Sequence, residues 1–272
     1  MKPKKLLSIP VLAVFIVMGF VYYNTVFVFL EDWVGLHSSV GSLNSLIFSL
    51  LAFFSLYSFL FCVLTDPGCV PSNYVPDEEG QCSPEEIHKN LRRCDKCYAY
   101  KPPRSHHCRV CKSCILKMDH HCIWVNNCVG YRNHKAFLLL VLYGALGSTY
   151  STVIFVSSTL QKDWASQSGS LKGFYIACGV LMVGLCMSLI TLLAWHIYLV
   201  THNMTTIEYY EGLRTAWLAR KSGQSYRHLY DVGAYRNITL ILGQNMLKWL
   251  CPVSVSHLKD GTDFPTTRDS SS

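Results

Sequence analysis

The sequence predicts an α-helical polytopic membrane protein, with four transmembrane helices and a cytosolic cysteine-rich domain between helices 2 and 3. Three observations lead to this prediction. The chain of 272 residues is 50% apolar and only 15% charged, whereas soluble domains average about 25% charged residues. Four long stretches contain no Asp, Glu, Lys or Arg. Finally, seven of the 13 cysteines lie between residues 94 and 128.

The four apolar stretches cover residues 9–30, 43–64, 136–160 and 173–200. An α-helix rises ~1.5 Å per residue, so about 20 residues cross the ~30 Å hydrocarbon core of a bilayer. The first stretch resembles a signal peptide because Lys2, Lys4 and Lys5 precede it. It is longer than the apolar part of a signal peptide, and no small-x-small cleavage site follows it. We therefore expect it to be retained as a membrane anchor.

Lys and Arg are distributed unevenly among the segments outside these stretches. Residues 65–135 contain eleven and the tail beyond residue 200 contains eight, whereas the links 31–42 and 161–172 contain none and two. Because cytosolic loops are enriched in Lys and Arg, both termini and the cysteine-rich segment are predicted to face the cytosol. The net charge of +7 then comes mainly from this excess of Lys and Arg on the cytosolic side. It would also attract the protein's cytosolic surface to anionic lipids of the bilayer. We expect no nucleic-acid partner.

These segments divide the chain into four regions. Residues 1–64 contain transmembrane helices 1 and 2, residues 65–135 the cysteine-rich domain, residues 136–200 helices 3 and 4, and residues 201–272 a cytosolic C-terminal region. Within that last region, the apolar residues of 235–252 predict a short helix at the membrane interface. No internal repeat is apparent in the chain.

The cysteine-rich segment has the ligands for two metal sites. Its Cys-x2-Cys pairs bring two thiolates to one metal ion, and histidines are interleaved with them. Because the cytosol keeps thiols reduced, this pattern indicates zinc rather than disulfides. Two tetrahedral sites need eight ligands, and the segment holds seven cysteines and four histidines. Two Cys3His sites would leave one cysteine and some histidines over, and spacing alone does not identify which cysteine that is.

Cys122 is the candidate for the spare thiol. It lacks a Cys-x2-Cys partner and follows Asp119 and His120 closely, as a nucleophile activated by a base and an orienting acid would. A zinc ion nearby would favour the thiolate further. In the alternative, these residues are all ligands or supports, and the segment is an inert zinc module that recruits a partner. A channel or transporter is disfavoured because the apolar stretches lack charged residues.

Residues 94–137 resemble the cysteine-rich domain of the DHHC family of protein S-acyltransferases. The resemblance lies in Cys94-x2-Cys97, in the run from Lys101 to Cys108, in Asp119-His-His-Cys122 and in Asn127-Cys-Val-Gly130. It continues outside this segment, in Asp66-Pro-Gly68, in Thr205-Thr-Ile-Glu208 and in a C-terminal pattern around Asn237. Nearly the whole chain is covered. One departure is Ile123, where many members of the family have proline.

The resemblance implies how the metal ligands are divided. One structural zinc ion would be held by Cys94, Cys97, His107 and Cys114, and the other by Cys108, Cys111, His121 and Cys128.

The resemblance also implies a reaction and roles for further residues. Cys122 would be the nucleophile that takes a palmitoyl group from palmitoyl-CoA and passes it to cysteines of cytosolic-facing proteins, with His120 as general base and Asp119 as the orienting acid. We expect Lys101, Arg104 and His106 to contact the phosphates of CoA, although each fits a solvated loop charge equally well. Structural support is expected from Asn237, Thr206 and Glu208. The membrane would belong to the endomembrane system, with the Golgi favoured, or be the plasma membrane.

Overall fold

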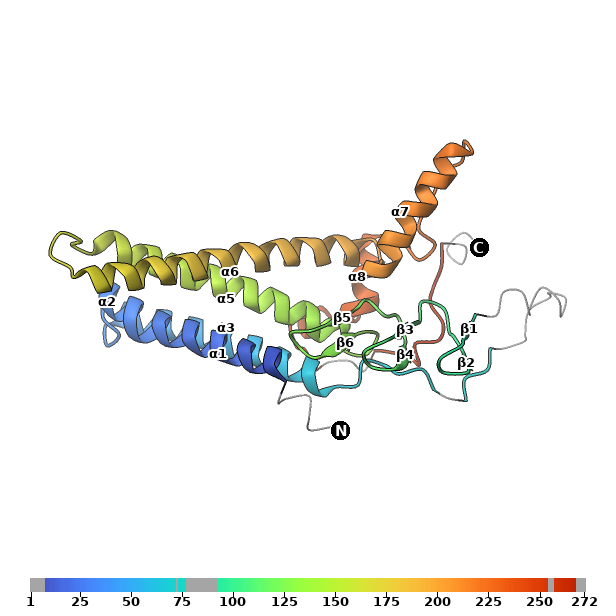
Figure 1. Cartoon of the computed structure of the whole chain (residues 1–272), viewed down its shortest axis with the longest axis horizontal. Coiled ribbons are helices and arrows are strands. Elements are labelled where there is room, and N and C mark those ends of the chain that lie inside the picture. The colour runs from blue at the N-terminus through green and yellow to red at the C-terminus, as the bar shows by residue number, and fades with distance from the viewer. Residues whose placement is uncertain (1–7, 72, 77–91, 254–256, 268–272) are drawn as a thin grey trace. The chain divides into compact units, whose positions relative to one another are not determined.

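The computed structural model describes residues 8–71, 73–76, 92–253 and 257–267 (Figure 1). The three lysines near the amino terminus lie outside these residues. Within the described ranges, four helical stretches are long and apolar enough to cross a membrane: Ile9–Val34, Ser39–Leu64, His134–Gln161 and Gly169–Thr201. The prediction of four such helices is confirmed. The helices extend a few residues past most of the predicted limits, and the added residues include charged ones such as Asp32, Lys135 and Lys172, which lie at or just beyond the ends of the apolar stretches.

The first of these stretches is not a uniform α-helix. It consists of α1 (Ile9–Asn24), a π-helical turn η2 (Thr25–Phe29) and α2 (Leu30–Val34). The Thr25 hydroxyl donates to the carbonyl of Val21 at 2.6 Å and shares a second hydrogen bond of 2.6 Å with the Ser151 hydroxyl. Such hydroxyl pairs join helices where lipid offers no competing partner. The π turn therefore begins where the chain makes a polar contact with a second helix.

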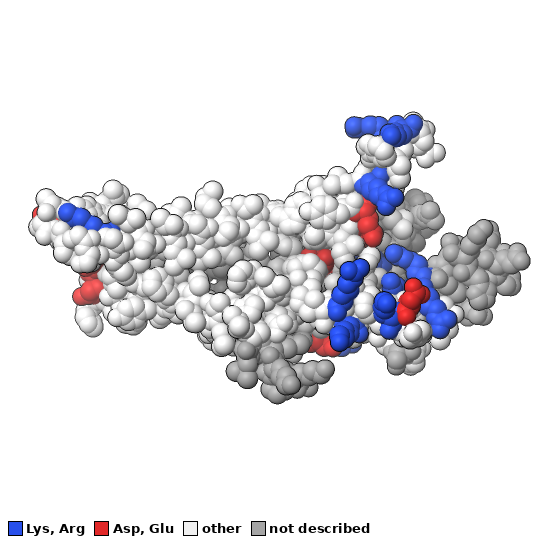
Figure 2. Space-filling model, in the orientation of Figure 1, with Lys and Arg blue, Asp and Glu red and all other residues white. Residues whose placement is uncertain are grey.

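The other membrane helices are α3 (Ser39–Leu64), α5 (His134–Gln161) and α6 (Gly169–Thr201). The first stretch packs with them around a buried hydrophobic cluster that includes Phe29, Phe48, Phe155, Tyr175 and Met182. On the face shown in Figure 2, the long middle part of these helices is free of blue and red atoms, and charged side chains gather at the end that holds α2 and the link between α5 and α6. The chain forms two compact units: one is Lys2–Leu60 with Phe137–His196, and the other is Phe61–Ala136 with Ile197–Ser272.

The cysteine-rich segment folds into three short antiparallel hairpins. They pair β1 (Arg93–Cys94) with β2 (Ala99–Tyr100), β3 (His106–Cys108) with β4 (Ser113–Ile115), and β5 (His120–Cys122) with β6 (Asn127–Val129). The first strands end at Cys94, Cys108 and Cys122, each 14 residues after the one before. At the matching place in each turn, one residue takes a left-handed conformation: Tyr98, Lys112 and Asn126, with φ of 52°, 55° and 46°.

The expectation that the chain has no internal repeat is therefore wrong. The segment is a tandem array of three 14-residue hairpins. The repeat is hard to see in the sequence because it is carried by turn geometry and ligand positions, while the residues between them differ.

The second compact unit also contains α7 (Thr206–Lys221), α8 (Ala234–Leu242) and a 3-10 turn, η3 (Met246–Lys248). A capping box starts α7: the Thr205 hydroxyl accepts from the Glu208 N–H, and the Glu208 carboxylate accepts from the Thr205 N–H. The predicted helix over 235–252 is shorter than expected. It ends at Leu242 because Gly243 adopts a φ of 95°, which favours glycine and breaks the helix.

A buried guanidinium joins the hairpin array to α7. Arg104 donates through Nε and Nη2 to the two carboxylate oxygens of Glu208, both at 2.7 Å. It also donates to the side-chain oxygen of Asn203 at 3.1 Å and to its carbonyl at 2.7 Å. The rings of Tyr230 and Phe264 lie 4.3 and 5.0 Å from its guanidinium carbon. One side chain thus contacts three separate segments of the C-terminal region.

We predict that Glu208→Gln destabilises the protein by about 3 kcal/mol, because it leaves the Arg104 charge buried without its counterion while Gln still caps the helix. Unfolding in detergent, followed by heat or denaturant, measures the loss. Glu211→Gln, an exposed change on the same helix, is the control. Equal stability of Glu208→Gln and the control would show that the ion pair contributes nothing.

The same ion pair makes the stability of the fold depend on pH in the acid range. Burial would raise the pKa of Glu208, but the Arg104 guanidinium outweighs burial and holds the pKa below its usual value of 4.5. A carboxylate with a lowered pKa stabilises the fold above its unfolded-state pKa, and this contribution is lost as the pH falls through the folded-state value. In a plot of unfolding stability against pH, the loss of stability at acid pH is therefore expected to be smaller in Glu208→Gln than in the wild type.

Candidate functional site

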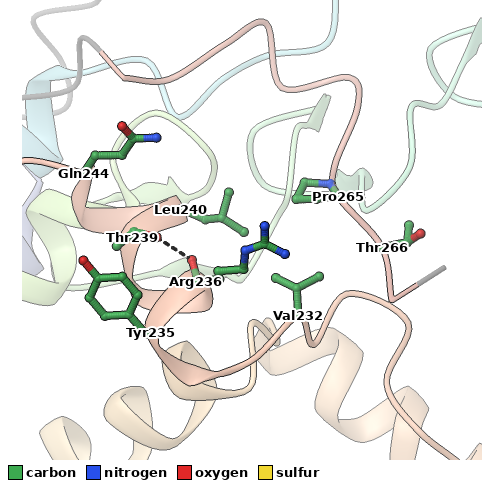
Figure 3. A pocket seen from close by; sticks show the side chains of 8 residues that line it. All are labelled: Val232, Tyr235, Arg236, Thr239, Leu240, Gln244, Pro265 and Thr266. Atoms are coloured by element: carbon green, nitrogen blue, oxygen red, sulfur yellow. Dashed lines mark hydrogen bonds between the residues drawn. The ribbon is translucent and has the colours of Figure 1, made fainter. Parts of the chain in front are cut away.

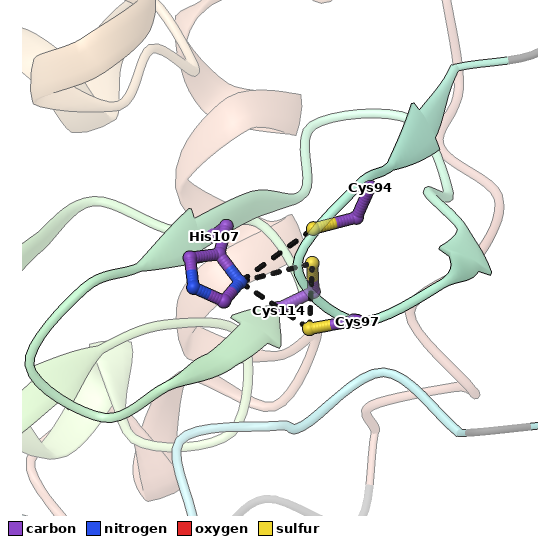
Figure 4. A group of neighbouring side chains, drawn as sticks. All are labelled: Cys94, Cys97, His107 and Cys114. Atoms are coloured by element: carbon purple, nitrogen blue, oxygen red, sulfur yellow. Dashed lines mark hydrogen bonds between the residues drawn. The ribbon is translucent and has the colours of Figure 1, made fainter.

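Four side chains from the first two hairpins converge at one point. Cys94, Cys97, His107 and Cys114 place their ligand atoms within 4.8 Å of one another (Figure 4). The Nδ1 atom of His107 lies 3.6, 3.3 and 3.9 Å from the three sulfur atoms, and the sulfurs of Cys97 and Cys114 are 3.8 Å apart.

The second and third hairpins form a matching group of four, namely Cys108, Cys111, His121 and Cys128. Here Nδ1 of His121 lies 3.6, 3.5 and 3.5 Å from the three sulfur atoms, and the sulfurs of Cys111 and Cys128 are 3.5 Å apart.

Both groups fit a zinc ion. Zinc binds thiolate sulfur at ~2.3 Å and imidazole nitrogen at ~2.0 Å, so the edges of a tetrahedron of such ligands measure about 3.5–3.8 Å. The distances between the side chains agree with those edges. Three thiolates and one imidazole also form a closed ligand set of the structural type, with no position left for water.

The hairpin array explains which residues belong to which group. Each group takes the Cys-x2-Cys turn of one hairpin and a cross-strand His–Cys pair from the next hairpin, either His107–Cys114 or His121–Cys128. Three hairpins have only two such junctions. The third turn has no following hairpin, and its second cysteine position is taken by Val125. Cys122 is therefore the thiol of the array left outside both groups, an assignment that spacing alone left open.

A carboxylate and an imidazole are held beside Cys122. Asp119 is fully buried and lies 2.6 Å from Nδ1 of His120. Its two oxygens also accept hydrogen bonds from the Thr206 N–H at 2.8 Å and the Thr206 hydroxyl at 2.9 Å. Thr206 is the first residue of α7, where unpaired N–H groups and the helix dipole favour a negative charge. The start of α7 thus orients the Asp119 carboxylate, which orients His120.

The electrostatics of this group favour an ion pair. Burial would lower the pKa of His120, but its hydrogen bonds to Asp119 and Cys122 outweigh burial and raise the pKa to about 9. Burial would raise the pKa of Cys122, but the His120 hydrogen bond and the backbone N–H groups of Val125 and Trp124 lower it. Both shifts favour a thiolate beside an imidazolium over a neutral thiol and imidazole, and a larger thiolate fraction makes a cysteine more reactive.

The remaining residues singled out in the sequence lie in different surroundings. Lys101 and His106 are half-buried. Arg104 is engaged in the buried ion pair with Glu208, so its position favours a structural role over contact with a phosphate. Asn237 is buried and donates to the Thr201 carbonyl at 2.8 Å and to the Asp231 carboxylate at 2.7 Å.

Sequence reasoning missed Asn203. This residue is buried, accepts from Arg104 and from the Lys117 ammonium at 3.1 Å, and donates to the Tyr230 carbonyl at 2.8 Å. A signal was available, because an asparagine just past a long helix is typical of a left-handed helix end, and Asn203 has a φ of 49°.

Comparison with known proteins agrees with this site. Residues 87–212 match the family described as DHHC palmitoyltransferase. "Probable protein S-acyltransferase 15" of Arabidopsis thaliana is 58% identical over 255 residues, which cover 93% of this chain and 100% of that protein. "Probable protein S-acyltransferase 16" of the same plant is 49% identical over 270 residues, covering 97% and 94%. "Palmitoyltransferase ZDHHC15" of Rattus norvegicus is 38% identical over 179 residues, covering 64% and 50%.

We predict that Cys97→Ser and Cys111→Ser each lower the zinc content of the purified protein from about two ions to one or fewer. The central hairpin contributes ligands to both groups, so losing one ion loosens the support of the other. Elemental analysis against protein concentration measures the ratio. Cys69→Ser, a change at an exposed thiol outside both groups, is the control and is expected to keep both ions. Full zinc content in either ligand variant would refute this assignment.

We further predict that iodoacetamide modifies Cys122 faster than an ordinary thiol at pH 7, with a rate midpoint below pH ~8.5. His120→Gln removes the imidazole and is expected to slow the reaction at least tenfold at that pH, because only a few per cent of an unperturbed thiol is ionised there. Peptide mass spectrometry follows each cysteine separately, so Cys69 in the same sample reports any general change in reactivity. An unchanged rate at Cys122 in His120→Gln, with zinc retained, would contradict the ion pair.

Proposed function

Because the chain belongs to the DHHC palmitoyltransferase family it is a protein S-acyltransferase, and we propose that Cys122 is the residue that carries the acyl group. The observation that supports this assignment is the position of Cys122 in the hairpin array. It lies outside both four-residue groups and hydrogen-bonds to an imidazole that a buried carboxylate holds. An inert zinc module would not need a thiol in those surroundings.

In the first step, the Cys122 thiolate attacks the carbonyl carbon of palmitoyl-CoA. The bond from that carbon to the CoA sulfur breaks as the new thioester forms, and the His120 imidazolium gives its proton to the departing CoA thiolate. Asp119 keeps the imidazole oriented and stabilises its charged form. The products of this step are an acyl-enzyme and free CoA.

In the second step, a cysteine thiol of the protein substrate replaces CoA. The neutral His120 takes the proton of that thiol, and the resulting thiolate attacks the acyl group on Cys122. The acyl group leaves on the substrate, and the Cys122 thiolate beside the imidazolium is restored. Each step exchanges one thioester for another, so the driving force is small and the positioning of the reacting groups supplies most of the rate.

The two Cys3His groups would hold structural zinc ions. The metals would supply folding energy and clamp neighbouring hairpins together, since a closed ligand set leaves no position for substrate. The consequence for the reaction is geometric. Because His121 is a ligand, the second site would fix the strand that also carries His120 and Cys122.

We propose that Lys101 and His106 bind the phosphates of CoA. Arg104 is not included, because its guanidinium is engaged in the buried ion pair with Glu208. The Lys101 and His106 side chains are half-buried on the hairpin array and belong to the resemblance with the family. Lys101→Gln is therefore expected to raise the KM for palmitoyl-CoA with little change in kcat. An unaltered KM would remove Lys101 from the headgroup site.

The proposed location is an endomembrane, with the Golgi favoured, or the plasma membrane, and the proposed active site and termini face the cytosol. This orientation rests on the distribution of Lys and Arg. A membrane-impermeant maleimide applied to sealed microsomes whose cytosolic face is outward tests it. Labelling of the exposed Cys69 without detergent supports the orientation, and labelling only after detergent would reverse it.

The central experiment uses purified wild type, Cys122→Ser and Cys69→Ser in detergent with labelled palmitoyl-CoA. We predict hydroxylamine-sensitive label on the wild type and on Cys69→Ser, and none on Cys122→Ser, with about two zinc ions in all three. Equal label on wild type and Cys122→Ser would move the chemistry to another cysteine. Absence of label on a zinc-replete wild type would favour the recruiting scaffold.

A further inference from the structure

A basic cavity lies beside α8, and Cys122 is not among the residues that line it. It has a volume of about 770 Å³ and is bounded by α8, the η3 turn and the C-terminal residues 257–265. Lys117, Lys248 and Lys259 line it, and Asp263 is the acidic residue in the lining. A second hollow of about 580 Å³ adjoins it along α8, sharing residues such as Thr239.

The second hollow adds another cation. Figure 3 shows the Arg236 side chain extending from α8 toward Val232 and Pro265. Within the described part of the chain, Arg236, Lys248 and Lys259 form no ion pair. The two adjoining hollows therefore have more basic than acidic side chains in their lining, and most of these basic side chains have no acidic partner among the residues that the structure describes.

Lys117 is the most unusual part of the lining. Its side chain is buried, and among the described residues its ammonium makes one hydrogen bond, to the Asn203 side-chain oxygen. Two of its three N–H donors are left over. Burial and the neighbouring Arg104 lower its pKa to about 7. A buried cation in this position is satisfied best by an anion that enters the cavity.

The cavity lies at the level where a membrane helix begins. Lys135, in the first turn of α5, donates to the carbonyl of Leu242 at 3.0 Å and to the carbonyl of Lys248 at 2.8 Å. These bonds hold the η3 turn at the start of that helix. The turn exposes large apolar side chains: Met246 is 60% and Leu247 94% accessible. Apolar side chains beside lysines at this level are typical of segments that enter the interface.

We propose that this cavity binds the phosphate headgroup of an anionic membrane phospholipid. The headgroup phosphate lies among Lys117, Lys248 and Lys259, with Arg236 at the adjoining hollow, and the acyl chains run beside the exposed side chains of η3. The ligand is a lipid rather than a soluble phosphate because the basic lining and the exposed apolar turn are continuous. This lipid is a bound ligand and not the acyl donor, so the inference goes beyond the proposed reaction.

The test is native mass spectrometry of the full-length protein in detergent, titrated with dioleoyl phosphatidic acid or with dioleoyl phosphatidylcholine as the zwitterionic match. The variant of the cavity, called the groove variant below, combines Arg236→Gln in the adjoining hollow with Lys259→Gln in the cavity. The control combines Arg220→Gln and Lys221→Gln, which remove the same charge from exposed positions on α7. Each basic residue near an anionic lipid contributes about fivefold in affinity, so the groove variant is expected to bind phosphatidic acid about 10- to 30-fold more weakly. The control is expected to bind as wild type does.

Two results would overturn the proposal. Equal weakening in the groove variant and the control would reduce the effect to general surface charge. Equal binding of phosphatidic acid and phosphatidylcholine by the wild type would remove the role of the anionic headgroup.

A third arm separates a lipid from a soluble anion. Leu247→Ser is expected to weaken phosphatidic acid binding, and neither inorganic phosphate nor free CoA is expected to displace the lipid. Displacement by either at equal concentration would assign the cavity to a soluble phosphate instead. Zinc content and Cys122 acylation, measured on every variant, show that the fold is intact and keep this test independent of the proposed acyl transfer.

Discussion

The arrangement of the cysteine-rich segment and the C-terminal region depends on the contacts of one buried group, the guanidinium of Arg104. It pairs with Glu208, the residue whose carboxylate also caps the start of α7, and it lies against the ring of Phe264 in the C-terminal segment. A charge in these surroundings is costly unless it is fully paired, so the segments that pair it are held at defined positions. The contacts of Arg104 therefore fix the positions of α7 and of the C-terminal segment around Phe264 relative to the hairpin array.

A short series of hydrogen bonds connects this arrangement to Cys122, the proposed nucleophile. The capping box sets where α7 begins, and Thr206, its first residue, binds the carboxylate of Asp119. Asp119 in turn holds His120, which hydrogen-bonds Cys122. Asp119 is thus positioned by a helix that lies far from it in the chain. Weakening the Arg104–Glu208 ion pair is therefore expected to change the surroundings of Cys122.

In the hairpin array, the two groups of metal-type ligands and the proposed active site are built from one repeated element. Three copies of a hairpin provide two junctions that suit a metal ion, and the last copy retains the turn but not the second thiol. In this copy Val125 occupies the position of the second ligand, and its backbone N–H bonds to Cys122 as a turn N–H bonds to the ligand Cys108. The turn that would stabilise a metal-bound thiolate in two copies thus lowers the pKa of the thiol left outside both groups in the third.

The sequence by itself determined four stretches apolar enough to cross a membrane and a cluster of zinc-type ligands, because the length of an apolar stretch and the spacing of chelating residues are local properties. The resemblance to the family then implied how these ligands divide into two groups. Only the tertiary structure decided the partners of Arg104, which resembles a solvated loop charge until Glu208, 104 residues away, is brought against it. The structure likewise showed that the turns repeat, and the junctions between hairpins explain why Cys122, which the sequence had singled out as the spare thiol, lies outside both groups. The cavity beside α8 has no signature in the chain, since its lysines come from segments that meet only after folding. Long-range pairing of charges and the enclosure of a cavity depend on how distant segments pack, and no spacing rule along the chain reports that.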